Sequence, residues 1–267
     1  MTWEEAVIPR GFNEFVGQSG IRQEIELLLA AARITGERVP HILLTGEYGL
    51  GKTTLGKMAA GDRGYGLIYG GDFGTVRLDF PTLVIDEIHR VQDNTQLCVL
   101  MDAPNTASVV GCTTDPQDLT PALRSRFIQF RLMPYTEVEL SQILERVTRR
   151  LHIPCDVSVL LDVSRRAKGV ARVSLNYLRR LRDRMIVIGA PLTVESVQQF
   201  FEEIGVTEWG LTRDDLAYLS VLSHTPTGLQ QLASRTGLTE GTILEEVEPF
   251  LLRKGLVLRT PRGRVLV

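Results

Sequence analysis

The sequence predicts a parallel α/β sheet domain followed by an all-α domain and a C-terminal winged helix. Three observations support this prediction. Up to about Pro134, short runs that are apolar on both faces alternate with helical patterns, as in a parallel sheet covered on both sides. Beyond Pro134 the strand patterns stop and four amphipathic helical patterns follow. The last segment contains a helix, a helix–turn–helix and a hairpin, in that order.

The elements of the first part follow in order along the chain. Apolar residues at helical spacing predict a helix over residues 18–36 that ends at Gly36. Seven glycines between positions 56 and 74 indicate turns and mobility rather than a long helix. The other predicted elements, strands alternating with helices, are HILLTG, KTTLGKMAA, TLVID, NTQLCVLM, ASVVGCTT, a short helix near LTPALRSR, and FIQFRL.

The all-α part and the winged part complete the predicted architecture. Amphipathic patterns predict helices over residues 136–150, 156–168, 172–188 and 193–204. The winged part consists of three helices and a hairpin, namely DDLAYLSVLS, TGLQQLASRTG, TEGTILEEVEPFLLRKG and LVLRTPRGRVLV. We therefore expect three domains, at residues 1–134, 135–207 and 208–267.

Composition and charge exclude several classes of protein. Hydrophobic residues make up 43% of the 267 residues, but no apolar run is long enough to span a membrane, and the charged N-terminus is unlike a signal peptide. Cys98, Cys112 and Cys155 lack metal spacing and indicate free buried thiols, so we expect a cytoplasmic protein that does not bind membranes. The net charge is −2, yet basic residues cluster in residues 165–184 and 253–264. Such clusters suit either phosphate contacts or solvated helix faces.

A phosphate-binding loop is predicted at residues 46–53. GEYGLGKT fits the pattern G-x-x-x-x-G-K-[ST], begins where a strand ends and leads into a helix. Its glycines let backbone N–H groups turn towards phosphates, and the helix adds its positive N-terminus. Lys52 should reach the β- and γ-phosphates of ATP, and Thr53 should hold Mg²⁺. The predicted nucleotide contacts here are Gly46, Gly49, Leu50, Gly51, Lys52, Thr53 and Thr54.

An acid pair complements this loop. In LVIDE, four apolar residues lead to Asp86 at the end of a buried strand, and Glu87 follows. Asp86 should bind Mg²⁺, and Glu87 should polarise an attacking water. Because the pair occurs together with the loop, we interpret it as catalytic rather than as a simple strand end. The reaction is then hydrolysis of a nucleoside triphosphate.

Further polar residues could serve the same site. Thr113 and Thr114 end another apolar strand, where a hydroxyl could position the attacking water, although Thr113 fits equally well as an ordinary strand end. Arg172 begins a helix of the all-α part and could detect the γ-phosphate, or it could be one more basic surface residue. PALRSRF contains Arg124 and Arg126 with no acid within five residues except Asp118. These arginines need an anion from elsewhere.

These motifs occur in the order found in AAA+ ATPases, and the sequence most closely resembles the RuvB family, the bacterial motors of Holliday-junction branch migration. The resemblance covers nearly the whole chain, and its most specific part is C-terminal, because AAA+ proteins in general lack that segment. It rests on NEFVGQ, GLGKTTL, LVIDEIHR, TT (113–114), PALRSRF, PYTEVEL, GVAR, LRRLRD and EPFLLRKGLVLRTPRGR.

The resemblance implies roles for individual residues. Lys52 with Thr53, and Asp86 with Glu87, would be the Walker A and Walker B pairs. Thr114 would be sensor 1, Arg126 an arginine finger given to a neighbouring subunit, and Arg172 sensor 2. The adenine would lie against Tyr135 and the backbone near Phe15, Val16 and Gly17. ATP and Mg²⁺ would be bound in a homo-oligomer, expected to be a hexameric ring.

Several positions depart from the family pattern. Glu47 and Tyr48 replace the two prolines usual in the loop, and Ala171 replaces the proline usual in sensor 2. The segment between Lys52 and Asp86 is shorter than in the family. Between Met101 and Val109, where the family has a long β-hairpin that docks on RuvA, the chain has room only for a turn. The motor parts are thus kept, while a RuvA-type partner is doubtful.

The winged part suggests contact with DNA through its hairpin. The third helix carries Glu240, Glu245, Glu246 and Glu248, which would repel phosphates and argue against reading of the major groove. Arg259, Arg262 and Arg264 cluster at the hairpin and could bind DNA without sequence preference. A winged helix used for protein contact is the alternative.

Two functions are favoured by particular parts of the sequence, and a third, a nucleotide-binding protein with little turnover that regulates through its wing, stays open beside them. The first is an ATP-hydrolysing, ring-forming DNA motor, a translocase or helicase of the RuvB type, that acts on branched or duplex DNA in recombination and repair. The second is an AAA+ loader of a helicase or clamp, or an adaptor ATPase that recruits another DNA-processing machine. The missing hairpin favours the second function, and the C-terminal match favours the first.

Overall fold

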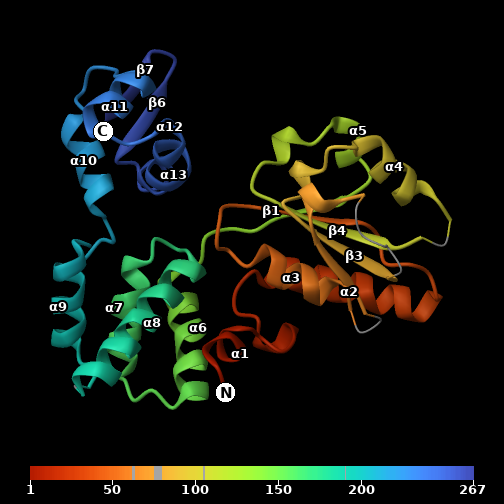
Figure 1. Ribbon diagram of the computed structural model, residues 1–267, viewed down its shortest axis with the longest axis horizontal. Helices are drawn as coiled ribbons and strands as arrows, with labels where there is room; N and C mark the ends of the chain where they lie inside the picture. The colour runs from red at the N-terminus through yellow and green to blue at the C-terminus, as the bar shows by residue number, and fades with distance from the viewer. Residues whose placement is uncertain (62–63, 75–79, 105, 190) are drawn as a thin grey trace. The chain divides into compact units, whose positions relative to one another are not determined.

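The computed structural model describes residues 1–61, 64–74, 80–104, 106–189 and 191–267 (Figure 1). The chain forms two compact units. The first unit comprises Met1–Ile153 with Gly169–Tyr177, and the second comprises Pro154–Lys168 with Leu178–Val267. Helix α8 (Ala171–Ile188) begins in the first unit and ends in the second. The division into three domains at residues 134 and 207 stays a prediction.

A parallel sheet forms the centre of the first unit. Its strands are β1 (Ile42–Thr45), β2 (Gly66–Tyr69), β3 (Thr82–Asp86), β4 (Ser108–Thr113) and β5 (Ile128–Arg131), in the order β2-β3-β4-β1-β5. The register pairs Thr45 with Thr113 and Tyr69 with Asp86. Because every pairing between these strands is parallel, their carboxyl ends meet at one edge of the sheet.

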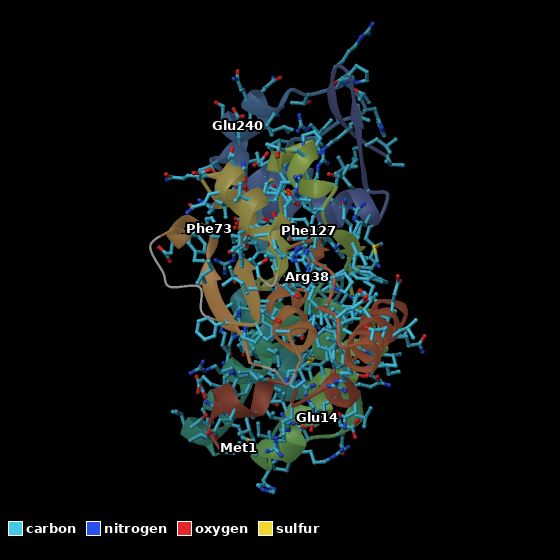
Figure 2. All side chains as sticks on the ribbon, turned by 90° about the vertical axis from the view of Figure 1, so that its right-hand side faces the viewer. Met1, Glu14, Arg38, Phe73, Phe127 and Glu240 are labelled. Carbon is cyan, nitrogen blue, oxygen red and sulfur yellow. The ribbon has the colours of Figure 1, made fainter. Side chains whose placement is uncertain are left out.

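Helices cover both faces of this sheet (Figure 1). Helices α2 (Ser19–Thr35) and α3 (Lys52–Ala59) lie on one face, and α4 (Asn94–Asp102) and α5 (Pro121–Arg124) lie on the other. The core under α4 and α5 contains Phe127, labelled in Figure 2, and the buried side chains Leu43, Ile85, Leu97, Val109 and Leu123. Strand residues alternate between the faces, so the two helix layers bury both sides of the sheet.

The N-terminal segment is attached to the first helix after the sheet. Helix α6 (Glu137–Leu151) begins with a capping box between Thr136 and Glu139. Its Arg146 donates to the carbonyl of Val7 at 2.9 Å, at the end of α1 (Trp3–Val7). The unit also contains the short 3₁₀ turns η1 (Phe12–Glu14), η2 (Gly70–Asp72), η3 (Ile88–Arg90) and η4 (Pro116–Asp118).

The second unit contains helices and one hairpin. Helices α7 (Val157–Arg166) and α9 (Val194–Ile204) accompany the end of α8. The winged part consists of α10 (Arg213–Val221), α11 (Leu229–Thr236), α12 (Glu240–Thr242), the π-helical turn η5 (Ile243–Val247), α13 (Glu248–Arg253), β6 (Val257–Thr260) and β7 (Gly263–Leu266). Its buried core includes Tyr218, Leu232, Ile243, Leu251 and Val257.

The structure differs from the sequence prediction in four places. The glycine-rich segment contains a strand, β2, because Gly66–Tyr69 pairs with β3 at the sheet edge; residues 62 and 63 of that segment lie outside the described residues. Helix α1 was not predicted. The third helix of the winged part contains a π-helical turn just before Pro249, which has no N–H to donate. Cys112 is buried as expected, whereas Cys98 and Cys155 are partly exposed.

Among the described residues, no helix combines the length and the apolar character needed to cross a membrane.

Candidate nucleotide site

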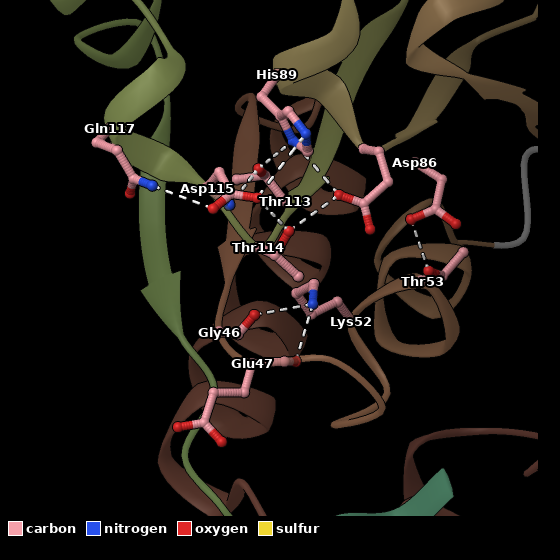
Figure 3. Close-up of polar contacts among 11 residues, drawn as sticks. Gly46, Glu47, Lys52, Thr53, Asp86, His89, Thr113, Thr114, Asp115 and Gln117 are labelled. Atoms are coloured by element: carbon pink, nitrogen blue, oxygen red, sulfur yellow. Dashed lines mark hydrogen bonds and ion pairs between the residues drawn. The ribbon is translucent and has the colours of Figure 1, made fainter. Parts of the chain in front are cut away.

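The predicted phosphate-binding loop connects β1 to α3, as its motif requires. Lys52 is buried, and its Nζ donates to the carbonyl oxygens of Gly46 at 2.9 Å and Glu47 at 3.0 Å (Figure 3). Burial lowers the pKa of the Lys52 ammonium group, while Glu87 and Asp86 act in the opposite direction. The ammonium group is thus held inside the loop by weak neutral acceptors that a phosphate could replace.

Two oxygen ligands for a divalent cation lie beside this loop. Thr53 Oγ1 donates to Asp86 Oδ1 at 2.8 Å (Figure 3). In the part of the chain that the structure describes, no three His, Cys, Asp or Glu side chains form a metal cage. One hydroxyl and one carboxylate fit Mg²⁺, because Mg²⁺ at phosphate sites takes few protein ligands and completes its shell with water and phosphate.

The second acid of the pair has a strained backbone. Glu87 has φ +49° and ψ +53°, a left-handed conformation that is unusual for a residue with a side chain. Its carbonyl oxygen is so close to Gly70 that a Cβ on Gly70 would lie 2.3 Å from it. The turn after β2 therefore fixes the backbone of Glu87, and only glycine fits at position 70.

A polar network connects Glu87 to the end of β4 (Figure 3). Thr114 Oγ1 lies 3.4 Å from Glu87 Oε2 and donates to it. His89 Nδ1 shares a hydrogen bond of 2.8 Å with Thr113 Oγ1 and lies 3.4 Å from Glu87 Oε2. Sequence reasoning included Thr114 but missed His89. The only sequence signal was a polar residue shortly after the acid pair. Thr113 is fully buried and is not among the residues that line the phosphate cavity described below.

The predicted sensor arginine reaches the same place. A cavity of about 160 Å³ is lined by Lys52, Thr53, Asp86, Glu87 and Arg172, among others. The Arg172 backbone N–H donates to Gly49 O at 3.2 Å, and its guanidinium lies 5.2 Å from the centre of the Tyr48 ring. Gly49 has φ +75°, and a Cβ there would lie 2.8 Å from Arg172 Cβ.

A second cavity, of about 270 Å³, has the character of a site for a flat ring. Phe15, Val16 and Tyr135 line it, as do Gly49, Gly51 and Thr54. Tyr135 is buried, and its hydroxyl donates to Leu50 O at 2.9 Å. Gly17 does not line the cavity but lies against the Tyr135 ring. The residues predicted to contact adenine are therefore close together in the first unit.

Arg126 does not belong to either cavity. It is absent from the described residues that line them. Its anion comes from a residue that sequence reasoning did not consider. Asp102, 24 residues earlier, accepts from Arg126 Nε at 2.9 Å and from Nη2 at 2.6 Å. The anion does come from elsewhere in the sequence, as expected, but within this chain it is a carboxylate at the end of α4.

Two of the three arginines of the wing are also paired. Glu248 is fully buried; it accepts from Arg259 Nε and Arg264 Nε, both at 2.8 Å, and from the Tyr218 hydroxyl at 2.7 Å. The sequence grouped Glu248 with the acids of its helix that would repel phosphates, but this carboxylate is buried and paired inside the wing. Arg262 is exposed at the turn between the strands.

The P-loop after β1, the acid pair at the end of β3 and the arginine at the start of α8 define a P-loop ATPase of the AAA+ type. Family comparison makes the assignment more specific. Residues 7–70 match the family described as "Holliday junction DNA helicase RuvB P-loop domain", residues 135–206 the "RuvB AAA lid domain", and residues 208–267 the "RuvB C-terminal winged helix domain". The chain belongs to the RuvB family.

Individual relatives agree over the full length. The subunit RuvB of the Holliday junction branch migration complex from Clavibacter michiganensis is 35% identical, across 99% of this chain and 84% of the relative. The RuvB from Fervidobacterium nodosum is 31% identical across 96% and 85%. The solved Thermotoga maritima RuvB branch migration motor superposes with a TM-score of 0.87 at 30% identity, covering 98% of this chain and 95% of that one.

The expected loss of the hairpin agrees with the structure around it. Helix α4 ends at Asp102 and β4 begins at Ser108. Between them the structure describes residues 103, 104, 106 and 107, and none of these is in a strand.

Proposed function

We propose that the chain is an ATP-driven, ring-forming DNA motor that acts on branched or duplex DNA in recombination and repair. The observation that carries this proposal is the phosphate cavity, where Lys52, Asp86, Glu87 and Arg172 meet. The relatives are named for Holliday junction branch migration. A cytoplasmic location is part of the proposal, because ATP is supplied there.

The cavity residues suggest how ATP would be hydrolysed. The adenine would lie beside Tyr135, and Lys52 would leave the carbonyls of Gly46 and Glu47 to bind the β- and γ-phosphates. Thr53 and Asp86 would hold Mg²⁺, which when bound neutralises charge on the phosphate oxygens.

Glu87 would take a proton from the attacking water while the oxygen of that water bonds to the γ-phosphorus. The bond to the β–γ bridging oxygen breaks, leaving ADP and phosphate. Thr114 and His89 would hold the Glu87 carboxylate in place. Arg172 would bind the γ-phosphate from within the subunit.

A neighbouring subunit would complete the site. Arg126 does not line its own cavity but belongs to the motif that, by resemblance, gives an arginine finger. We propose that Arg126 contacts the γ-phosphate held by the next subunit of a hexameric ring. Hydrolysis then requires assembly, which explains why an arginine that matters for catalysis can lie outside the cavity of its own chain.

DNA would bind to the hairpin of the wing. Arg259, Arg262 and Arg264 stay the proposed contacts, and they bind phosphates without reading bases. Arg262 is the principal contact in this proposal, because it is exposed at the turn while Glu248 holds the other two. A phosphate contact of this kind should make binding salt-dependent.

A branch-migration assay tests the motor directly. A synthetic four-way DNA junction is incubated with the protein, ATP and Mg²⁺, with and without a RuvA-type protein, and the separated duplexes are measured. Glu87→Gln is the matched control, because it keeps the site but removes the base. The motor predicts ATP-dependent separation by the wild type and none by Glu87→Gln. Hydrolysis without any separation in either condition would contradict it.

The second candidate is an AAA+ loader or adaptor ATPase that recruits another DNA machine. The direct passage from α4 to β4 favours it, since the family's RuvA-docking element lies there. This candidate predicts ATP-dependent assembly on DNA, measured by sedimentation with a non-hydrolysable ATP analogue, while the junction itself stays intact in the branch-migration assay.

A further inference from the structure

Each of the three guanidinium nitrogens of Arg126 donates a hydrogen bond within its own chain. Nε and Nη2 donate to the two oxygens of Asp102, and Nη1 donates to Ala122 O at 2.6 Å. The pair is nevertheless open to solvent, with 30% of the Arg126 side chain and 57% of the Asp102 side chain exposed. The hydrogen bonds from Arg126 hold the pKa of Asp102 below its ordinary value, so the carboxylate is charged at neutral pH.

The position of Asp102 is unfavourable for its own helix. Asp102 is the last residue of α4, where the helix dipole is negative and an acid is destabilising. Arg38, labelled in Figure 2, donates to Met101 O at 3.1 Å, and His41 lies 3.2 Å from the same oxygen. These two groups fix the end of α4. The end of α4 therefore holds the carboxylate at a defined place, although an acid at this position does not stabilise the helix.

An arginine in this state cannot offer the parallel pair of hydrogen bonds from Nε and Nη2 to a phosphate without first leaving the carboxylate. An exposed ion pair is weak, and the γ-phosphate carries more charge than a carboxylate and accepts the same two parallel hydrogen bonds. Resting on the proposed trans role of Arg126, we infer that Asp102 is a positioning residue that holds Arg126 in the free subunit and releases it to the nucleotide of the next subunit on assembly.

Asp102 should affect the protein concentration at which the subunits assemble. Arg126 must break its hydrogen bonds to Asp102 before it can contact the neighbouring nucleotide. This cost makes the free energy of each such contact less favourable. Removal of the Asp102 charge should therefore make the active assembly form at lower protein concentration. Once assembly is complete, Asp102 has no further role, so the rate per site and the KM for ATP should not change.

The test is ATP hydrolysis as a function of protein concentration for the wild type and Asp102→Asn. The variant should reach half-maximal rate per subunit at roughly two- to fivefold lower concentration, with unchanged kcat and KM at saturating protein. Asp102→Ser, which also removes the charge, should give the same shift. The matched control is Glu203→Gln, which breaks the exposed two-hydrogen-bond pair of Glu203 with Arg184 in the second unit.

The outcomes separate this inference from the proposed function. If Arg126→Ala abolishes hydrolysis but Asp102→Asn and Asp102→Ser follow the wild-type concentration curve, the holding role is wrong and the finger stands. A curve displaced to higher concentration also overturns the holding role, because Asp102 would then support the productive position. If Arg126→Ala hydrolyses ATP at the wild-type rate, both the proposed arginine finger and the holding role of Asp102 are wrong.

Discussion

Arg126 and the wing arginines are both bound by carboxylates, but in opposite surroundings. Asp102 binds Arg126 at the surface, with both side chains partly exposed. Glu248 binds Arg259 and Arg264 from the interior of the wing and is itself completely buried. The exposed pair costs little to open, because water and salt replace the lost contacts. The buried pair cannot open without leaving an unpaired charge inside the protein.

The difference indicates which arginines can work by changing partner. In our proposal Arg126 exchanges its carboxylate for a phosphate of another subunit, and its exposed ion pair suits this role. Arg259 and Arg264 are instead held by a carboxylate that is buried inside the wing. Arg259 and Arg262 both have exposed side chains on the wing, and of these two only Arg259 is bound by Glu248. The function of an arginine here depends on the burial of the acid that holds it.

The largest effect is expected from Arg126→Ala. Removal of an arginine that stabilises the transition state should lower the hydrolysis rate by ~10³–10⁵-fold, because related trans arginines contribute that much. Nucleotide affinity, measured by titration with a fluorescent ATP analogue, should stay nearly unchanged, since Arg126 lies outside its own cavity. Loss of nucleotide binding would instead place Arg126 in the site of its own subunit.

Glu248→Ala should damage stability rather than catalysis. The variant leaves Arg264 and the Tyr218 hydroxyl without their buried partner, which we expect to destabilise the wing by about 3–5 kcal/mol. Chemical denaturation followed by tyrosine and tryptophan fluorescence measures this loss. Glu246→Ala, which alters an exposed acid two residues earlier, should change stability by less than about 0.5 kcal/mol. Equal midpoints for the two variants would show that the buried cluster is not structural.

The same cluster predicts a pH dependence. Burial alone would raise the pKa of Glu248, but hydrogen bonds from Arg264, Tyr218 and Arg259 outweigh it and leave the pKa below its ordinary value. The charged cluster therefore stabilises the fold above the ordinary pKa of glutamate, and this stability is lost as the pH falls through the lower pKa of the folded state. Glu248→Gln should show a smaller loss of stability on acidification than the wild type.

Gly49→Ala should weaken nucleotide binding by about 1–3 kcal/mol, the usual cost of a strained backbone. A Cβ at this left-handed position would meet the side chains of Val170 and Arg172. Isothermal titration with ATP measures the effect. Gly20→Ala is the control, because an added Cβ at Gly20 meets nothing within 4 Å. Similar affinities in both variants would mean that the loop tolerates a side chain there.

The smallest effect is expected at the wing surface. Arg262→Ala should reduce the slope of log affinity against log salt for duplex DNA by about 0.9, the value for one phosphate contact. Arg264→Ala should lower stability more than DNA affinity, because its side chain is committed to Glu248. Fluorescence anisotropy at several salt concentrations separates the two. A loss of DNA affinity in Arg264→Ala, with little change in Arg262→Ala, would mean that the pair of Arg264 with Glu248 opens when DNA binds.

The sequence predicted the parts of the site whose chemistry is local. Lys52 and Thr53 lie within one motif, and Asp86 with Glu87 ends one apolar strand, so pattern and spacing were sufficient. The ion pairs were not predictable in this way. Asp102 and Arg126 are 24 residues apart, and Glu248 and Arg264 are 16 apart. Only the fold brings them together. β2 was missed because Gly66–Tyr69 is too short and glycine-rich to stand out before it pairs with β3.

A mixing experiment tests the central claim most directly. Glu87→Gln keeps the finger but lacks the base, and Arg126→Ala keeps the base but lacks the finger. Each variant alone should be inactive in ATP hydrolysis. If Arg126 acts on the nucleotide of the next subunit, a mixture of the two should regain hydrolysis, with a maximum near equal amounts. A mixture as inactive as its components, together with normal co-assembly of the two variants, would contradict the account.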